Sequence, residues 1–144
     1  MSTTTIAPEI LKQMAKSASS AYENAYCPYS KYPVGAAILT NDGAIVNGCN
    51  VENAVYVVIH AEENAIGNAI TKGHRVFQAV LVLSKDGEAS PCGICRQKLY
   101  EHAKEMPVFT TNPNGEIIHQ WLLSELLPHA FGPHNLKESP NESP

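Results

Sequence analysis

Two short motifs contain residues that could bind a metal ion and move protons. One is His60-Ala61-Glu62 and the other is Pro91-Cys92-Gly93-Ile94-Cys95. Each motif lies at the predicted start of a helix, where free N–H groups and partial positive charge help to keep thiols ionised. Cys92 and Cys95 are three residues apart, so their sulfur atoms point the same way on one helical turn. Together with His60 they could bind one Zn²⁺ and leave a fourth position open, as catalytic zinc sites do.

Glu62 has the pattern of a proton carrier rather than of a metal ligand. It shares the predicted inward face of its helix with Ile66, Ala69 and Ile70. A carboxylate on an apolar face is unfavourable unless it has a partner or a chemical task. Beside zinc-bound water that task is proton transfer, for which burial raises the carboxyl pKa and the metal opposes the rise. Glu63, the next residue, is predicted to face elsewhere.

Each of these signals also has a simpler explanation. A single Cys-x-x-Cys is weak evidence for a metal, and a histidine at a helix start is more often a cap or a surface residue. The combination favours a catalytic metal over a structural zinc module, which would need a fourth ligand. His74 and His102 are available by type, but nothing in their spacing recommends them. Cys27 and Cys49 are predicted to be ordinary packed thiols.

The composition excludes several classes of protein. The chain has 144 residues, 44% of them apolar, and a formal net charge of −4. A net negative charge disfavours a protein that binds the phosphate backbone of nucleic acid. The chain lacks an apolar run of roughly 20 residues, and Met1–Thr5 does not resemble the start of a signal peptide. We therefore expect a cytoplasmic domain over residues 1–136, a flexible tail over residues 137–144, and no nucleic-acid or membrane partner.

Apolar spacing and turn residues predict the elements that position the two motifs. Helices are expected over about 8–25, 60–71 and 93–103, with one or two further turns over 122–127. Strands are expected over 34–40, 44–49, 79–84, 107–111 and 116–120. The turn Asn41-Asp42-Gly43 is predicted to join the first two strands as a hairpin. The third strand is almost wholly apolar, which predicts a central strand covered on both faces. This order predicts a layered α/β domain in which helices cover a mixed sheet.

The motifs together resemble the zinc-dependent deaminases of nucleobases, whose signature is His-x-Glu followed by Pro-Cys-x-x-Cys. Other segments resemble short-chain cytidine deaminases, namely Cys27–Ala37, Gly48–Ala54, Ser90–Gln97, Ser124–Pro128 and Ala130–Gly132. The resemblance implies a three-layer α/β/α domain with a five-stranded mixed sheet and one Zn²⁺ per subunit. It also implies hydrolysis of cytidine and deoxycytidine to uridine and deoxyuridine plus ammonia, a reaction of pyrimidine salvage.

Residues that contact the substrate follow from the same resemblance. Asn50 and Glu52 stand at positions that hold the ribose hydroxyls, and Tyr32 stands where an aromatic residue flanks the nucleoside. Ala61 is a further expected contact. The implied mechanism is attack of zinc-bound hydroxide on C4 of cytosine, with Glu62 as the proton shuttle.

The resemblance further implies self-association. Short-chain cytidine deaminases usually form homotetramers, in which an aromatic residue at the position of Phe131 reaches into a neighbouring subunit's site. Tyr56 also falls at an aromatic position near the subunit boundary. The predicted partners are therefore a nucleoside substrate and further copies of this chain.

At two positions the sequence departs from the family pattern. Short-chain members commonly have cysteine at the position of His60 and arginine at the position of Glu63. Three thiolates around Zn²⁺ give a centre of net charge −1 that an arginine can offset, whereas one imidazole and two thiolates give a neutral centre. Arg96, next to Cys95, remains as a residue that could donate to a thiolate sulfur.

Two rival activities stay open at this point. One is deamination of a modified cytosine nucleoside, such as a blasticidin-type or N4-substituted cytidine, although Asn50 and Glu52 favour an unmodified ribose. The other is editing of cytosine within nucleic acid, which the acidic charge and the lack of a basic and aromatic track disfavour.

Overall fold

A mixed sheet forms the centre of the computed structural model, which describes residues 5–136. Its five strands follow the order β2-β1-β3-β4-β5. The parallel pair is β3 with β4, and the other neighbours are antiparallel. The strands are β1 (Gly35–Thr40), β2 (Ile45–Cys49), β3 (Phe77–Leu83), β4 (Pro107–Thr111) and β5 (Ile117–Leu122). The predicted mixed five-stranded sheet, with its third strand at the centre, is confirmed.

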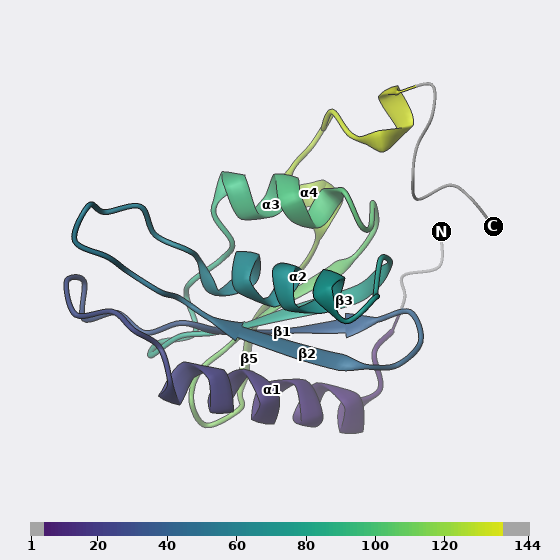
Figure 1. Cartoon of the computed structure of the whole chain (residues 1–144). Helices are drawn as coiled ribbons and strands as arrows, with labels where there is room; N and C mark the ends of the chain where they lie inside the picture. Colours follow the sequence, from purple (N-terminus) through teal and green to yellow (C-terminus); the bar gives the residue numbers. More distant parts are fainter. Residues whose placement is uncertain (1–4, 137–144) are drawn as a thin grey trace.

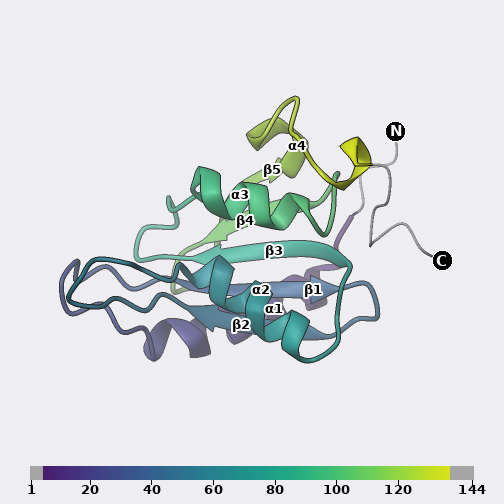
Figure 2. The same ribbon diagram turned by 45° about the horizontal axis from the view of Figure 1, so that its top comes forward.

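Helices cover both faces of this sheet. Helix α1 (Pro8–Glu23) lies on one face, and α2 (Ala61–Thr71) and α3 (Gly93–Tyr100) lie on the other (Figure 1). The turned view in Figure 2 shows α2 and α3 side by side along the sheet. A short helix α4 (Leu123–Leu126) follows β5, and a 3-10 turn η1 (Pro133–Asn135) comes near the end of the described residues. The three-layer α/β/α architecture is therefore confirmed.

Alternating residues of the central strands build a separate core on each face. Ala37 and Leu81 pack with Met14 of α1, whereas Ile38 and Val80 belong to the core beneath α2 and α3. Because side chains alternate between the two faces of a strand, a strand buried on both sides needs the continuous apolar run that β3 has. The two cores fix the level at which the helices lie above and below the sheet.

The main difference between expected and observed elements is the end of α3, which stops at Tyr100 rather than near residue 103. The chain turns there because the carbonyl of His102 accepts a hydrogen bond from the N–H of Phe77, at 3.3 Å. The rings of His102 and Phe77 also pack together, with centroids 4.6 Å apart. A contact with the start of β3 thus ends the helix, and helical spacing alone does not reveal it.

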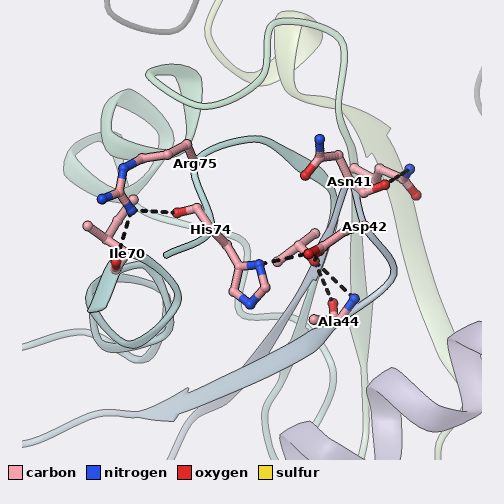
Figure 3. A network of polar contacts seen from close by, with 8 residues as sticks. Asn41, Asp42, Ala44, Ile70, His74 and Arg75 are labelled. Carbon is pink, nitrogen blue, oxygen red and sulfur yellow. Dashed lines mark hydrogen bonds and ion pairs between the residues drawn. The ribbon is translucent and has the colours of Figure 1, made fainter. Parts of the chain in front are cut away.

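The segment after the C-terminal end of α2 contacts the turn of the β1–β2 hairpin. His74 Nδ1 lies 3.3 Å from Asp42 Oδ1, and the guanidinium of Arg75 donates to the carbonyl of Ile70 at 2.9 Å (Figure 3). A hydrogen bond from Thr40 Oγ1 holds the pKa of Asp42 below its usual value. His74 therefore has a structural partner at the end of α2 opposite the two motifs.

Within residues 5–136, no helix combines the length and the apolar character that crossing a bilayer requires. The predicted tail over residues 137–144 lies outside the described residues.

Candidate active site

The side chains of His60, Cys92 and Cys95 meet between the starts of two helices. His60 is the N-cap residue of α2, Cys92 is the N-cap residue of α3, and Cys95 lies in the first turn of α3. His60 Nδ1 lies 3.3 Å from Cys92 Sγ and 3.5 Å from Cys95 Sγ. The structure thus brings together the three predicted ligands, whose ligand atoms all lie within 4.8 Å of one another.

This donor set fits zinc. Tetrahedral Zn²⁺ has Zn–S distances near 2.3 Å and Zn–N distances near 2.0–2.1 Å, so a ligand nitrogen and a ligand sulfur should lie about 3.5 Å apart. The two observed nitrogen–sulfur distances, 3.3 and 3.5 Å, agree with that value. Burial raises the pKa of the Cys95 thiol, with the nearby Glu62 carboxyl as the next cause. A bound cation would reverse that effect and stabilise the thiolate.

Glu62 points into the protein beside this group. It lies in the first turn of α2 and is only 5% exposed, as its place on the apolar face predicted. Burial raises the pKa of its carboxyl, although its own backbone N–H and the neighbouring His60 and Cys95 oppose the rise. A buried carboxyl group with a raised pKa next to a metal site is suited to accepting and releasing protons during a reaction.

Glu63 does not line the cavity, as its expected orientation away from Glu62 implies, but its carboxylate contacts the His60 backbone and α3. Its Oε1 accepts a hydrogen bond from the backbone N–H of His60 at 3.1 Å and lies 3.9 Å from His60 Nδ1. Its Oε2 forms an ion pair with Lys98 of α3. Burial alone would raise the pKa of Glu63, but the bonds from Lys98 and from the His60 backbone hold it below its usual value. Sequence reasoning missed Lys98, which carries no motif of its own.

A cavity of about 280 Å³ opens in front of these residues. Its size is close to the lower end of the range for small-molecule sites. Four of the predicted substrate contacts line it together with His60, Glu62 and Cys92, and these four are Tyr32, Asn50, Glu52 and Ala61. Ser30, Val34, Val58, Val82, Ala89 and Ser90 complete its wall.

Asn50 also holds part of the cavity wall in place. Its Oδ1 accepts from the backbone N–H of Val34 at 2.9 Å, and its Nδ2 donates to the carbonyl of Tyr32 at 2.8 Å. A primary amide has two N–H donors and two acceptor lone pairs, so one of each remains for a ligand. The geometry is therefore compatible with the predicted ribose contact and adds a structural role to it.

Glu52 likewise holds part of the cavity wall in place, through the turn that contains Tyr29 and Ser30. Its Oε1 accepts from the backbone N–H groups of Tyr29 and Ser30, at 3.0 and 3.1 Å. The hydroxyl of Ser30 donates to Oε2. These bonds, led by that of the Ser30 hydroxyl, hold the pKa of Glu52 below its usual value. Glu52 thus presents a carboxylate to the cavity.

Tyr32 and Phe131 differ in their relation to this cavity. Tyr32 lines it, and its hydroxyl donates to Asp86 Oδ1 at 3.4 Å. Phe131 is 63% exposed and is not part of the cavity wall of its own chain. Its ring is therefore accessible to a neighbouring molecule, as the role implied for Phe131 requires.

The guanidinium of Arg96 braces the loop that leads to Cys92. It donates through Nε to the carbonyl of Pro91 at 2.7 Å, through Nη1 to the carbonyl of Leu126 at 2.9 Å, and through Nη2 to Ser90 Oγ at 3.3 Å. Its hydrogen bonds within residues 5–136 go to oxygen atoms, not to a thiolate sulfur as the sequence suggested. Arg96 therefore influences the site through the loop before Cys92 and through α4.

Comparisons with known proteins agree with this geometry. A sequence model of the cytidine and deoxycytidylate deaminase zinc-binding region matches residues 8–111. A cytidine deaminase of Sporosarcina psychrophila is 44% identical over 131 residues, which cover 89% of this chain and 95% of that protein. A cytidine deaminase of Halalkalibacterium halodurans is 37% identical over 130 residues, which cover 88% of this chain and 98% of that protein.

Solved structures show the same similarity in three dimensions. The crystal structure of cytidine deaminase from Burkholderia pseudomallei superposes with a TM-score of 0.78 at 39% identity, covering 88% of this chain and all of that one. That of cytidine deaminase from Mycobacterium tuberculosis gives a TM-score of 0.72 at 36% identity, covering 83% of this chain and 95% of that one. With a matching sequence model, a matching fold and a histidine and two cysteines grouped as zinc ligands, this chain belongs to the zinc-dependent cytidine and deoxycytidylate deaminase family.

Proposed function

We propose that this chain is a cytidine deaminase that hydrolyses cytidine and deoxycytidine to uridine and deoxyuridine plus ammonia. The observation that carries the proposal is the position of the buried Glu62 carboxyl, which shares one cavity wall with His60 and Cys92. Asn50 and Glu52, on another part of that wall, supply polar groups for ribose hydroxyls. The named relatives are cytidine deaminases, which supports this choice of substrate.

Glu62 is the residue that moves protons in the proposed reaction. Zinc held by His60, Cys92 and Cys95 would supply a Lewis acid that turns water into a nucleophile near neutral pH. Glu62 accepts one water proton at its carboxylate and donates it to N3 of cytosine, which makes C4 more electrophilic. It then transfers the second water proton to the C4 amino group, which leaves as ammonia. The oxygen atom of water remains on C4 as the carbonyl of uracil.

The walls of the cavity determine which nucleosides fit. Asn50 and Glu52 favour a ribose with free hydroxyls over a sugar that carries large substituents. We therefore expect turnover of cytidine to exceed turnover of blasticidin-type nucleosides, and the rate on N4-substituted cytidines, whose ribose is unmodified, tests the part of the cavity that receives the base. The reverse order of rates would support the rival activity.

The direct test is the loss of cytidine absorbance on addition of the protein, with and without a zinc chelator. Glu62→Gln keeps the shape of the side chain but cannot accept the proton, so kcat should fall by at least about 10²–10⁴-fold while zinc content stays at one per chain. Cys92→Ala should lose both zinc and activity. Glu23→Gln, an exposed change on α1, is the matched control and should remain fully active. Full turnover by the Glu62→Gln protein would rule out the assigned role.

Self-association is a further part of the proposal. Apolar side chains of the segment after Glu52 are exposed on the single chain, with Tyr56 74% and Val55 75% exposed. Clusters of exposed apolar residues commonly mark protein interfaces. We expect a homotetramer in which Phe131 contacts a neighbouring subunit's site. The cytoplasmic location expected from the sequence stays a prediction.

A further inference from the structure

One ion pair links the two helices that supply the proposed zinc ligands. Lys98 of α3 pairs through Nζ with Oε2 of Glu63 on α2. Glu63 follows His60 by three residues, and Lys98 follows Cys95 by three residues, so each charge lies one helical turn from a ligand. The ion pair therefore joins the same two helices that the metal would join, through the first turn of α2 and the last turn of α3.

Glu63 connects this ion pair directly to the histidine. Its other oxygen, Oε1, accepts from the backbone N–H of His60 at 3.1 Å and lies 3.9 Å from His60 Nδ1. One carboxylate thus contacts the backbone of the N-cap residue of α2 and the side chain of an α3 residue. Movement of α3 away from α2 would have to break one of these two bonds.

The two side chains of the ion pair differ in how far they are buried. The Glu63 side chain is only 17% exposed, whereas that of Lys98 is 51% exposed. A carboxylate that is largely removed from water requires a partner. Loss of the ion pair is therefore more unfavourable for the charge of Glu63 than for the charge of Lys98. Neither side chain is among the residues that line the cavity, so neither contacts the substrate there.

We propose that Glu63 and Lys98 are positioning residues that hold His60 against Cys92 and Cys95 and thereby slow the loss of zinc. The proposal rests on the zinc site of the proposed function but assigns a role to two residues outside it. Loss of the pair should affect metal retention, and kcat through the fraction of protein that keeps zinc. It should leave KM for cytidine unchanged, because the cavity wall is unaltered.

The test measures zinc release from the purified holoenzyme to a coloured chelator. Changes in residues that orient metal ligands commonly cost 10–100-fold in metal affinity or activity, so Lys98→Met should release zinc at least about tenfold faster. Glu63→Gln should do the same, and the double variant should be no worse than the single ones, because both changes remove one interaction. Lys98→Arg keeps the charge and should restore slow release.

Two further measurements separate positioning from a general loss of stability. Lys104→Met removes a lysine just beyond α3 and should leave the rate of zinc release unchanged. With Co²⁺ in place of zinc, the thiolate-to-metal absorption should change in the Lys98→Met protein and not in the Lys104→Met protein. KM for cytidine should stay within twofold of that of the unaltered enzyme.

The outcomes distinguish this inference from the proposed function. Failure of the unaltered protein to hold zinc would refute both. If that protein holds zinc but Lys98→Met releases it at the unaltered rate, only the positioning role is refuted. The same holds if Lys98→Arg fails to restore slow release.

Discussion

At Glu62, the burial that suits the reaction also works against the fold. The carboxyl is 5% exposed, and burial raises its pKa. When zinc is absent, the folded protein must either keep this group protonated or bury a charge, and both are unfavourable near neutral pH. Enzymes commonly accept such a loss of stability at the residues that perform catalysis.

The first prediction is that Glu62→Gln stabilises the zinc-free protein. The folded state holds the Glu62 proton more tightly than the unfolded state, so the wild type loses stability as pH rises above the unfolded carboxyl pKa, near 4.5. Glutamine does not ionise, so the variant avoids this loss. Thermal unfolding of the zinc-free proteins at pH 7 should show a Tm about 3–5 °C higher for the variant, which corresponds to roughly 1 kcal/mol.

The pH dependence is the control for that prediction. Near pH 4 the carboxyl is mostly protonated in both states of the wild type, so the two Tm values should approach each other. A Tm difference that stays constant between pH 4 and pH 7 would show that the carboxyl charge is not its cause. Glu23→Gln should shift Tm by no more than about 2 °C at either pH, because surface changes are usually within about 0.5 kcal/mol.

At the scale of elements, the position of α2 on β2 decides where His60 lies. Gly48 of β2 is buried against the helix backbone, and a Cβ there would lie 2.3 Å from Ala65 N and 2.8 Å from Ala61 O. The amides of Asn64 and Asn68 donate to the carbonyls of Cys49 and Asn47 on either side, at 3.0 and 2.9 Å. The helix thus rests directly on the strand, at a distance that only glycine permits.

The second prediction is that Gly48→Ala displaces α2 and weakens the zinc site. The added methyl group would meet backbone atoms, which cannot rotate away, so the helix must shift outward and carry His60 with it. Overpacking of this kind costs about 1–3 kcal/mol. Urea unfolding should show that loss, and the holoenzyme should release zinc faster than the unaltered protein.

Gly67 of α2 provides the matched control. A Cβ at this exposed position would have no atom within 4 Å. Gly67→Ala should therefore stabilise the protein by about 0.5–1 kcal/mol, since alanine favours the helix, and should leave zinc release unchanged. Equal stability of the two variants would disprove the close packing of α2 on β2.

Elements and ligands were predictable because they depend on local pattern. Apolar spacing placed α1 and β3 to within two residues at each end, and the turn at Asn41–Gly43 identified the hairpin. The buried orientation of Glu62 followed from its helical face. These features are set by neighbours in the sequence, so they leave a signal in it.

Features that depend on two distant segments left no such signal. The bonds from Asn50 to Val34 and Tyr32, and the pairing of Glu63 with Lys98, require the packed structure. A glutamate and a lysine 35 residues apart look like ordinary surface charges until α2 and α3 are placed side by side. The contacts of the Arg96 guanidinium were missed for the same reason.

For the whole molecule, the single chain leaves apolar side chains uncovered next to its own cavity. Tyr56 lies beside the ring of Tyr29, with centroids 5.5 Å apart, and both are exposed. Tyr29 and Tyr56 also line a second hollow that shares Ser30, Glu52 and Val58 with the cavity wall. A neighbouring subunit that covered this surface would therefore lie close to the substrate site.

The third prediction is that assembly and activity are lost together when this surface carries a charge. Tyr56→Asp should cost the isolated chain little stability, because the side chain is 74% exposed, but a buried and unpaired carboxylate should prevent association.

Sedimentation at micromolar concentration should give four chain masses for the unaltered protein and one for the variant. Val76→Asp places the same charge at an exposed position just before β3, at the end of that strand away from the site, and should leave the proposed tetramer intact. If Phe131 of a neighbour completes the site, Tyr56→Asp and Phe131→Ala should both lower kcat/KM, and only Tyr56→Asp should change the mass. A fully active single-chain species would show instead that each cavity is complete by itself.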